Sequence, residues 1–194
     1  MPPNQTPPIT QTTRERLLNA MMNALSTRGF HGVGLSEILS EADAPKGVLY
    51  HYFPGGKTEL ALAAIESGTE IMITRLTKSL GKKGELAVLI EKWFESSATL
   101  LSGEHFERGC LLATVALETT ADDEQLRAAL ADSFARIRSC LEDCLVSHGY
   151  SPEQSQSLAS LIVSAYEGAL IQARVAHDPS PLRRAARAMA PLLQ

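Results

Sequence analysis

The sequence predicts an all-α protein with a small N-terminal helical domain and a larger C-terminal one. Apolar residues recur at intervals of three or four along most of the chain, and no segment shows the alternation expected of a strand. Clusters of glycine and proline interrupt this pattern at spacings typical of helix ends. A chain of 194 residues is long enough for two such units.

The N-terminal domain is expected over residues 13–56, following a disordered polar arm over residues 1–12. A first helix should begin at a capping Thr13 and run to about Arg28, where Gly29 ends it. A second helix is indicated by apolar residues at positions 35, 38, 39 and 42, which share one helical face.

A third short helix is predicted between two stops. Pro45 suits a first helical turn, and Pro54 prevents the helix from continuing. Only Asp43 and Ala44 separate it from the second helix, so the two must cross steeply, as in a helix-turn-helix. In that motif the second of the two helices enters the major groove of DNA.

The outward side of this third helix carries bulky side chains with polar ends. Val48, Leu49 and Phe53 can point inward, which leaves the other large residues exposed. Such a face wastes apolar area unless another molecule docks on it, and Gly47 would let that molecule approach the backbone. The outward residues are Lys46, Tyr50, His51 and Tyr52.

From about Thr13 to Leu60 the sequence resembles the N-terminal domain of the TetR family of bacterial transcriptional regulators. The matching pieces are Gly29-Phe30, Ile38, residues 49–53 and Lys57. Further pieces are similar to the drug- and flavonoid-responsive LmrA/YxaF subgroup: Pro45-Lys46-Gly47, Gly55-Gly56, Gly109-Cys110 and residues 167–170. Two positions depart from the family pattern. Gly34 brings no phosphate-binding hydroxyl, and Asp43 replaces the usual turn glycine, although aspartate tolerates a left-handed conformation.

The resemblance implies a DNA-contacting surface. Lysines and tyrosine hydroxyls can bond phosphate oxygens, and Lys57 would do so at a helix N-terminus. Lys46 and His51 can reach base edges, with Pro45 and Gly47 allowing close approach. The predicted DNA-binding residues are Ser36, Pro45, Lys46, Gly47, Tyr50, His51, Tyr52 and Lys57.

Overall charge permits DNA binding without indicating it. The chain carries a net charge of −4, with a net +1 over residues 1–57 and −5 over the remainder. No apolar run approaches the roughly 18 residues of a membrane span, and the polar N-terminus has no signal core, so a cytoplasmic protein is expected.

The C-terminal domain, residues 57–194, is expected to sense a small molecule and to dimerise. Its predicted helices run, with approximate ends, from Lys57 to Leu80, Glu85 to Leu101, Arg108 to Thr119, the capping pair Asp122-Asp123 to His148, Pro152 to His177, and Leu182 to Leu193. A ligand cavity between them should be mostly apolar with a few polar groups.

Candidate cavity residues are large, and each could instead belong to the ordinary core. Trp93 is favoured because its N–H needs a partner. Glu118 and Glu167 lie in apolar surroundings and are either buried polar groups or exposed on the far side of their helices. The candidate cavity residues are Met72, Trp93, Phe94, Phe106, Cys110, Phe134, Ile137 and Tyr166.

Along one face of the helix that begins at Pro152 the side chains change from large to small, and small side chains let a second helix approach closely. Together with the last helix it could form a four-helix interface between two subunits, a use that the family resemblance implies. The alternative is packing inside one subunit. The candidate interface residues are Leu158, Leu161, Ile162, Ala165, Gly168, Ala169, Leu182, Ala186 and Met189.

No metal site, cofactor or enzyme activity is predicted. Cys140, Cys144 and His148 recur every four residues, but the outer two lie roughly 12 Å apart along a helix, too far for one ion. The common hydrolase, metalloprotease and phosphate-loop motifs are absent from the sequence.

These observations predict a homodimeric repressor of transcription that binds double-stranded operator DNA and is released by a small apolar or aromatic effector. Two alternatives stay open. A DNA-binding regulator could be switched by thiol oxidation, with Cys110 the most plausible thiol because it begins a helix, or by nothing at all. A helical small-molecule-binding module could have lost DNA binding altogether.

Overall fold

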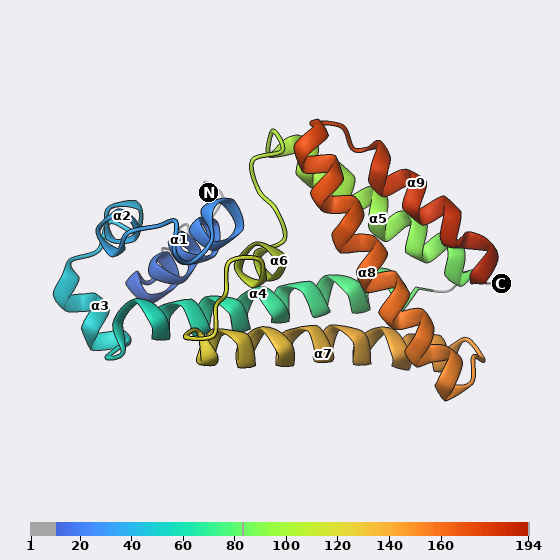
Figure 1. Ribbon diagram of the computed structural model, residues 1–194, viewed down its shortest axis with the longest axis horizontal. Helices are drawn as coiled ribbons and strands as arrows, with labels where there is room; N and C mark the ends of the chain where they lie inside the picture. Colours follow the sequence, from blue (N-terminus) through green and yellow to red (C-terminus); the bar gives the residue numbers. More distant parts are fainter. Residues whose placement is uncertain (1–10, 83, 194) are drawn as a thin grey trace, which may run out of the picture.

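The computed structural model describes residues 11–82 and 84–193, and within these residues the chain is helical without strands. The N-terminal domain and the larger C-terminal domain share one long central helix (Figure 1). The elements are α1 (Thr13–Arg28), α2 (Leu35–Glu41), α3 (Lys46–Tyr52), α4 (Gly56–Leu80), α5 (Leu86–Gly103), α6 (Leu111–Ala116), α7 (Glu124–Ser147), α8 (Pro152–Ala176), α9 (Ser180–Met189) and the 3-10 helix η1 (Ala190–Leu192).

The first helix is capped one residue earlier than predicted. Thr12, rather than Thr13, is the N-cap of α1, because its hydroxyl accepts a hydrogen bond from the Glu15 N–H while the Glu15 carboxylate accepts one from the Thr12 N–H. Thr12 is therefore part of the helix cap. The rest of the predicted arm, apart from Gln11, lies outside the described residues.

The turn between α2 and α3 has the predicted left-handed residue. Asp43 has a φ of 46°, a conformation that aspartate adopts more readily than most residues. Arg16 of α1 closes the turn by donating to the carbonyl oxygens of Ala42 at 2.8 Å and Asp43 at 3.0 Å. Below the turn, Ile38 and Leu49 are fully buried against α1, so both short helices are held on the same core.

Helix α4 connects the two domains. It packs against α1 at one end and lies beside α7 along the C-terminal domain (Figure 1). The buried Thr69 of α4 donates to the Ser133 hydroxyl of α7 at 2.9 Å, which adds a polar contact to this otherwise apolar seam. Helices α5, α8 and α9 pack together beyond it, and α6 lies against α1 and α4.

The predicted helix from Arg108 to Thr119 is wrong at both ends, since α6 spans only Leu111–Ala116. Before it, the N–H of Gly109 bonds the Ser26 carbonyl of α1 instead of an earlier carbonyl of its own helix. His105 and Phe106 have left-handed backbones, with φ of 54° and 62°, which breaks helical continuity further upstream. Tertiary contacts with α1 therefore determine this segment.

The last helix also ends earlier than predicted, at Met189 rather than Leu193, and continues as one turn of 3-10 helix that contains Pro191. The N-terminal α4 boundary is Gly56 instead of Lys57. Within residues 11–82 and 84–193, no helix is long and apolar enough to span a membrane.

Gly56 should be required for stability because it begins α4 with a φ of 67°, and a Cβ there would lie 3.3 Å from the Tyr50 ring. We expect Gly56→Ala to lower the free energy of unfolding by about 1–2 kcal/mol in urea titrations. Gly47→Ala is the matched control, since a Cβ at Gly47 meets nothing within 4 Å and alanine favours a helix interior by up to about 1 kcal/mol. Equal effects of the two substitutions would contradict this account.

Candidate nucleic-acid interface and effector cavity

Helix α3 presents its polar and aromatic side chains to solvent while its apolar side holds it in place. Leu49 and Phe53 are 0% and 2% exposed, whereas Tyr50 and Tyr52 are 44% and 40% exposed. Lys46 and His51 are exposed as well. The His51 and Tyr52 rings meet edge to face at 5.1 Å. This arrangement matches the outward face that the sequence predicts.

The neighbouring residues leave the start of α3 open. A Cβ at Gly47 would meet no atom within 4 Å, so a large surface could approach the backbone there. Pro45 is the N-cap residue of α3, and it lines a shallow hollow together with Ser36 of α2. Seven of the eight predicted DNA-binding residues therefore lie exposed on α2, α3 or the turn between them.

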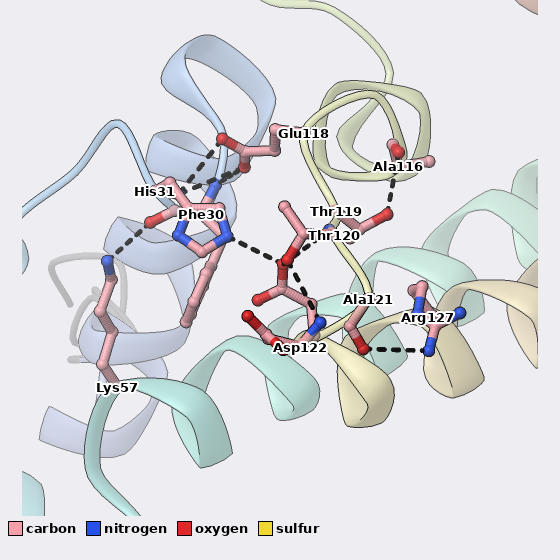
Figure 2. Close-up of polar contacts among 11 residues, drawn as sticks. Phe30, His31, Lys57, Ala116, Glu118, Thr119, Thr120, Ala121, Asp122 and Arg127 are labelled. Carbon is pink, nitrogen blue, oxygen red and sulfur yellow. Dashed lines mark hydrogen bonds and ion pairs between the residues drawn. The ribbon is translucent and has the colours of Figure 1, made fainter.

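Lys57, the eighth, is engaged within the protein. Its ammonium donates to the Phe30 carbonyl at 2.6 Å and lies 4.4 Å from the centre of the Phe30 ring (Figure 2). Burial lowers the pKa of Lys57, against the opposing charges of Glu118 and Glu37. One of its three N–H donors is thus already used to join α4 to the connection after α1.

The same connection is tied to the segment after α6. The Glu118 carboxylate accepts hydrogen bonds from the backbone N–H groups of Phe30 and His31 (Figure 2). The His31 ring lies 3.1 Å from the Asp123 carboxylate. Hydrogen bonds from Thr120, and then from His31, lower the pKa of Asp123. Glu118 therefore acts as an anchor for the N-terminal domain rather than as a polar group in a ligand cavity.

A second set of contacts fixes the end of α1 to the segment before α6. The Gly109 N–H donates to the Ser26 carbonyl at 2.8 Å. Arg174 of α8 donates to the carbonyl oxygens of Thr27 and Glu107, each at 3.1 Å. These contacts join residues up to 147 positions apart, and no local pattern in the sequence indicated Arg174.

Arg108 adds a third contact to α1. Its guanidinium donates to the Asn23 side-chain oxygen at 2.6 and 2.9 Å, and to Glu104 at 3.1 Å. We call the contacts made by Arg108, Gly109, Glu118 and Arg174 the interdomain anchors.

A cavity of about 750 Å³ opens among α4, α5, α6 and α8. Trp93 and Tyr166 stack in its wall, with ring centres 4.5 Å apart and an interplanar angle of 12°. The Tyr166 hydroxyl donates to Ser97 at 3.1 Å, and Ser97 also lines the cavity. Met72 and Cys110 complete the four predicted cavity residues that the structure places in this lining.

The other four predicted cavity residues lie outside the lining. Phe94 is fully buried and meets Tyr166 edge to face from behind, at 5.3 Å. Ile137 belongs to the core, and Phe134 packs against it. Phe106 contacts the His177 ring at 5.4 Å. Large apolar residues are common to cores and cavities, so their type alone could not separate these positions.

Cys110 of the cavity lining interacts with Glu167, a half-buried carboxyl group of α8. Burial raises the pKa of the Cys110 thiol well above its usual value, and the Glu167 charge raises it further. Burial also raises the pKa of Glu167 to about 7. Its Oε2 atom is shielded from solvent without a hydrogen-bond partner in the described part of the chain. Glu167 as a whole is half-buried with one carboxylate oxygen shielded from solvent, which favours the buried alternative of the two that the sequence left open.

Much of the predicted dimer face is used inside the subunit. Ile162 and Ala169 are buried, and Leu161, Ala165 and Gly168 lie on a different, more open side of α8. That open side also carries two exposed apolar residues that the sequence reasoning missed, Ile171 and Val175. Buried together with Ile162 and Ala169 are Leu182, Ala186 and Met189 of α9, while Leu158 is half-buried.

The cysteine-histidine stripe on α7 lies apart from both sites. The Cys144 sulfur is 3.8 Å from His148 Nδ1, and both cysteines are free thiols. Among the residues that the structure describes, no three histidine, cysteine or acidic side chains are grouped to hold a metal ion.

Comparison with known proteins accounts for both domains. Residues 17–64 match the family of bacterial regulatory proteins, tetR family, and residues 87–188 match the C-terminal domain of LmrA/YxaF-like transcriptional regulators. An uncharacterised HTH-type transcriptional regulator of Mycobacterium tuberculosis H37Rv is 34% identical over 179 residues, or 89% of each chain. The HTH-type transcriptional repressor NemR of Escherichia coli K12 is 31% identical over 184 residues, again 89% of each chain.

The fold agrees with these matches. The crystal structure of a regulatory protein TetR from Rhodobacter sphaeroides has a TM-score of 0.83 and 25% identity, and it covers 93% of this chain and 98% of that one. The geometry of the helix-turn-helix, the exposed face of α3 and the match of the C-terminal domain thus all indicate the same class of protein. The chain belongs to the TetR family of bacterial transcriptional regulators and is a DNA-binding regulator with an LmrA/YxaF-like C-terminal domain.

Proposed function

We propose that this DNA-binding regulator is a homodimeric repressor in the cytoplasm. A small effector with an aromatic or apolar body binds it and causes it to leave operator DNA. The observation that carries the proposal is the exposed face of α3, where Lys46, Tyr50 and His51 project from a helix anchored by Leu49. A rigid recognition helix needs such an anchor to keep its side chains in register with base edges. Repression, rather than activation, of transcription is supported by the relative NemR, which is named a repressor.

A dimer is needed to place two α3 helices on successive turns of DNA. The open side of α8 supports this part of the proposal, because Leu161, Ile171 and Val175 are 43%, 43% and 79% exposed. Gly168 lies among them, and a Cβ there would meet no atom within 4 Å, so a second helix could approach closely. These exposed apolar residues on one side of a single helix fit a symmetric contact between two α8 helices.

The cavity could influence DNA binding through the interdomain anchors. Arg108 and Gly109 both line the cavity, and both also bond residues of α1. A ligand that moves this segment would therefore change the position of the N-terminal domain relative to α4. Release then follows as a population shift, because the ligand binds better to the arrangement in which the two α3 helices are wrongly spaced.

A thiol-oxidation switch is less well supported. The thiolate is the reactive form of cysteine, and the raised pKa of Cys110 keeps it protonated at neutral pH. The 8% exposure of this residue also limits access by an oxidant. The other alternative was a small-molecule-binding module that has lost DNA binding. It conflicts with the exposed face of α3, which is held in place by buried residues.

Lys46→Ala should weaken binding to the operator about tenfold without affecting stability, because Lys46 is exposed and lies at the start of the recognition helix. The measurement is fluorescence anisotropy with DNA from upstream of the chain's own gene, at several salt concentrations. If Lys46 instead contacts a phosphate, the salt slope falls by about 0.9 and discrimination between sequences is unchanged.

Lys92→Ala is the matched control, since Lys92 is exposed on α5 within the C-terminal domain. Normal operator binding by Lys46→Ala would contradict the assignment of this surface. Lys57→Ala is a poorer test, because loss of its bond to Phe30 would also disturb the domain.

Arg174→Gln should uncouple the cavity from DNA. The substitution removes a guanidinium that bonds Thr27 and Glu107, but it leaves every residue of the cavity lining in place. A panel of flavones and bicyclic aromatic compounds would be titrated, with binding read from Trp93, the single tryptophan, and DNA release from anisotropy. We expect binding within about twofold of wild type and a several-fold smaller change in DNA affinity, since couplings of this kind are about 1–3 kcal/mol.

Arg138→Gln on α7 serves as the charge-matched control, because Arg138 makes no hydrogen bond within the described residues. If the ligand releases DNA from Arg174→Gln as fully as from the wild type, the contacts of Arg174 do not transmit the signal.

A further inference from the structure

The mouth of the cavity among α4, α5, α6 and α8 carries an excess of positive charge. Three cations come from α4 and the residues just after it, and a fourth from the segment before α6, whereas only one carboxylate lies in the lining. This excess stands out because residues 58–194 as a whole carry a net charge of −5. The cations are Arg75, Lys78, Lys82 and Arg108, and the carboxylate is Glu104.

The one carboxylate is already neutralised. Glu104 pairs with Arg108 at 3.1 Å, and Arg108 also bonds Asn23. By contrast, Arg75, Lys78 and Lys82 make neither a hydrogen bond nor an ion pair with any residue that the structure describes. Three cations at the mouth therefore have no protein partner there.

Two of these cations lie on one side of α4. Positions 75 and 78 are three residues apart, so their side chains are neighbours on the helix surface, and Lys82 follows just after the helix ends at Leu80. Arg75 is close enough to the cavity wall to act on Tyr166: burial raises the pKa of the Tyr166 hydroxyl, and the Arg75 charge counters part of that shift.

A second hollow in the same domain gives a contrast. The groove between α4 and α7 is also lined by a cation, Arg136, but that guanidinium is bound by the carboxylates of Glu66 and Glu70. Its lining also includes Asp143. The cation in that groove is thus paired with carboxylates of α4, whereas Arg75, Lys78 and Lys82, at the cavity that holds the stacked aromatic pair, have no such partner among the described residues.

The remaining acid nearby does not reverse this balance. Glu167 lies outside the cavity lining, and its Oε2 atom is shielded from solvent. Burial raises the pKa of Glu167, which disfavours its charged form.

We propose that the effector is an aromatic anion, with its ring system against Trp93 and Met72 and its carboxylate, sulfonate or phenolate at Arg75 and Lys78. This proposal rests on the proposed function, in which this cavity holds the effector. It narrows the sequence-based expectation of an apolar or aromatic effector to one chemical class. Neutral aromatic compounds would gain the apolar contacts alone, whereas an anion would also gain charge-assisted hydrogen bonds.

The test compares two probes that share one ring system, 1-naphthoate and 1-naphthamide, on the full-length protein. Binding is read from quenching of Trp93, which lies in the cavity wall. We expect 1-naphthoate to bind about tenfold more tightly or better, since a hydrogen bond to a charged group is worth more than a neutral one. The preference should shrink as salt is raised.

The variant Arg75→Gln/Lys78→Gln should lose most of this preference while still binding 1-naphthamide as wild type does, which also shows that its cavity is intact. Lys92→Gln on α5 removes an exposed cation outside the lining and should keep the full preference. The proposal is overturned if 1-naphthoate does not bind, if 1-naphthamide binds as tightly, or if the preference survives in the double variant.

Anisotropy of labelled operator DNA in the same samples separates this proposal from the proposed function. Preferential binding of 1-naphthoate with the DNA complex left intact would support the effector class and refute release by the cavity. Equal binding of both probes with release of DNA would support the repressor mechanism and overturn the effector class.

Discussion

The position of the DNA-binding domain depends on how the end of α1 is attached to the residues around α6. The Gly109 N–H and the Arg174 guanidinium satisfy carbonyl groups at Ser26 and Thr27, which the end of α1 would otherwise leave unpaired. Glu118 satisfies the N–H groups of Phe30 and His31 immediately afterwards. The end of α1 thereby forms a joint between the two domains, because the hydrogen-bond partners of its polar groups come from the C-terminal domain.

This joint explains why α6 is so short. Residues that could have continued the helix instead face α1, and their hydrogen bonds go to α1 or to Arg174 rather than to the preceding turn. Arg108 and Gly109 of this segment also line the cavity among α4, α5, α6 and α8. One segment of chain thus has the cavity on one side and the recognition domain on the other. On the proposed function, a change at one surface would reach the other through this segment, which is what reciprocal coupling requires.

The N-terminal domain could be predicted from sequence because its determinants are local. The Pro45 start, the stop at Pro54 and the left-handed Asp43 all act within a few residues, and the structure confirms each of them. The start of α4 was misplaced by one residue, since nothing in the local pattern required the left-handed Gly56 to belong to the helix. Lys57 shows the limit more clearly, because the carbonyl that it binds lies 27 residues away.

The C-terminal domain could be predicted only in outline, for a related reason. A stripe of small and apolar residues on α8 has the same appearance whether it packs within one subunit or between two. The structure buries Ile162 and Ala169 against the rest of the subunit and leaves Ile171 and Val175 open. Half of the predicted cavity residues lie outside the cavity lining for the same reason. The cations of the lining were missed because a charge run on a helix normally indicates a solvated face.

Arg108 belongs both to the charged lining of the cavity and to the contacts that join the C-terminal domain to α1. Its guanidinium lies in the cavity lining, neutralises Glu104 and bonds Asn23 of α1. An anion held at Arg75 and Lys78 would lie in the same lining as Arg108 and would attract its guanidinium in competition with Glu104 and Asn23, because a guanidinium has a fixed number of N–H groups in a planar fork. A neutral ligand of the same shape would fill the cavity without that competition. On this proposal the charge of the effector would do more than raise affinity, since it would draw on the same side chain that holds the end of the recognition domain.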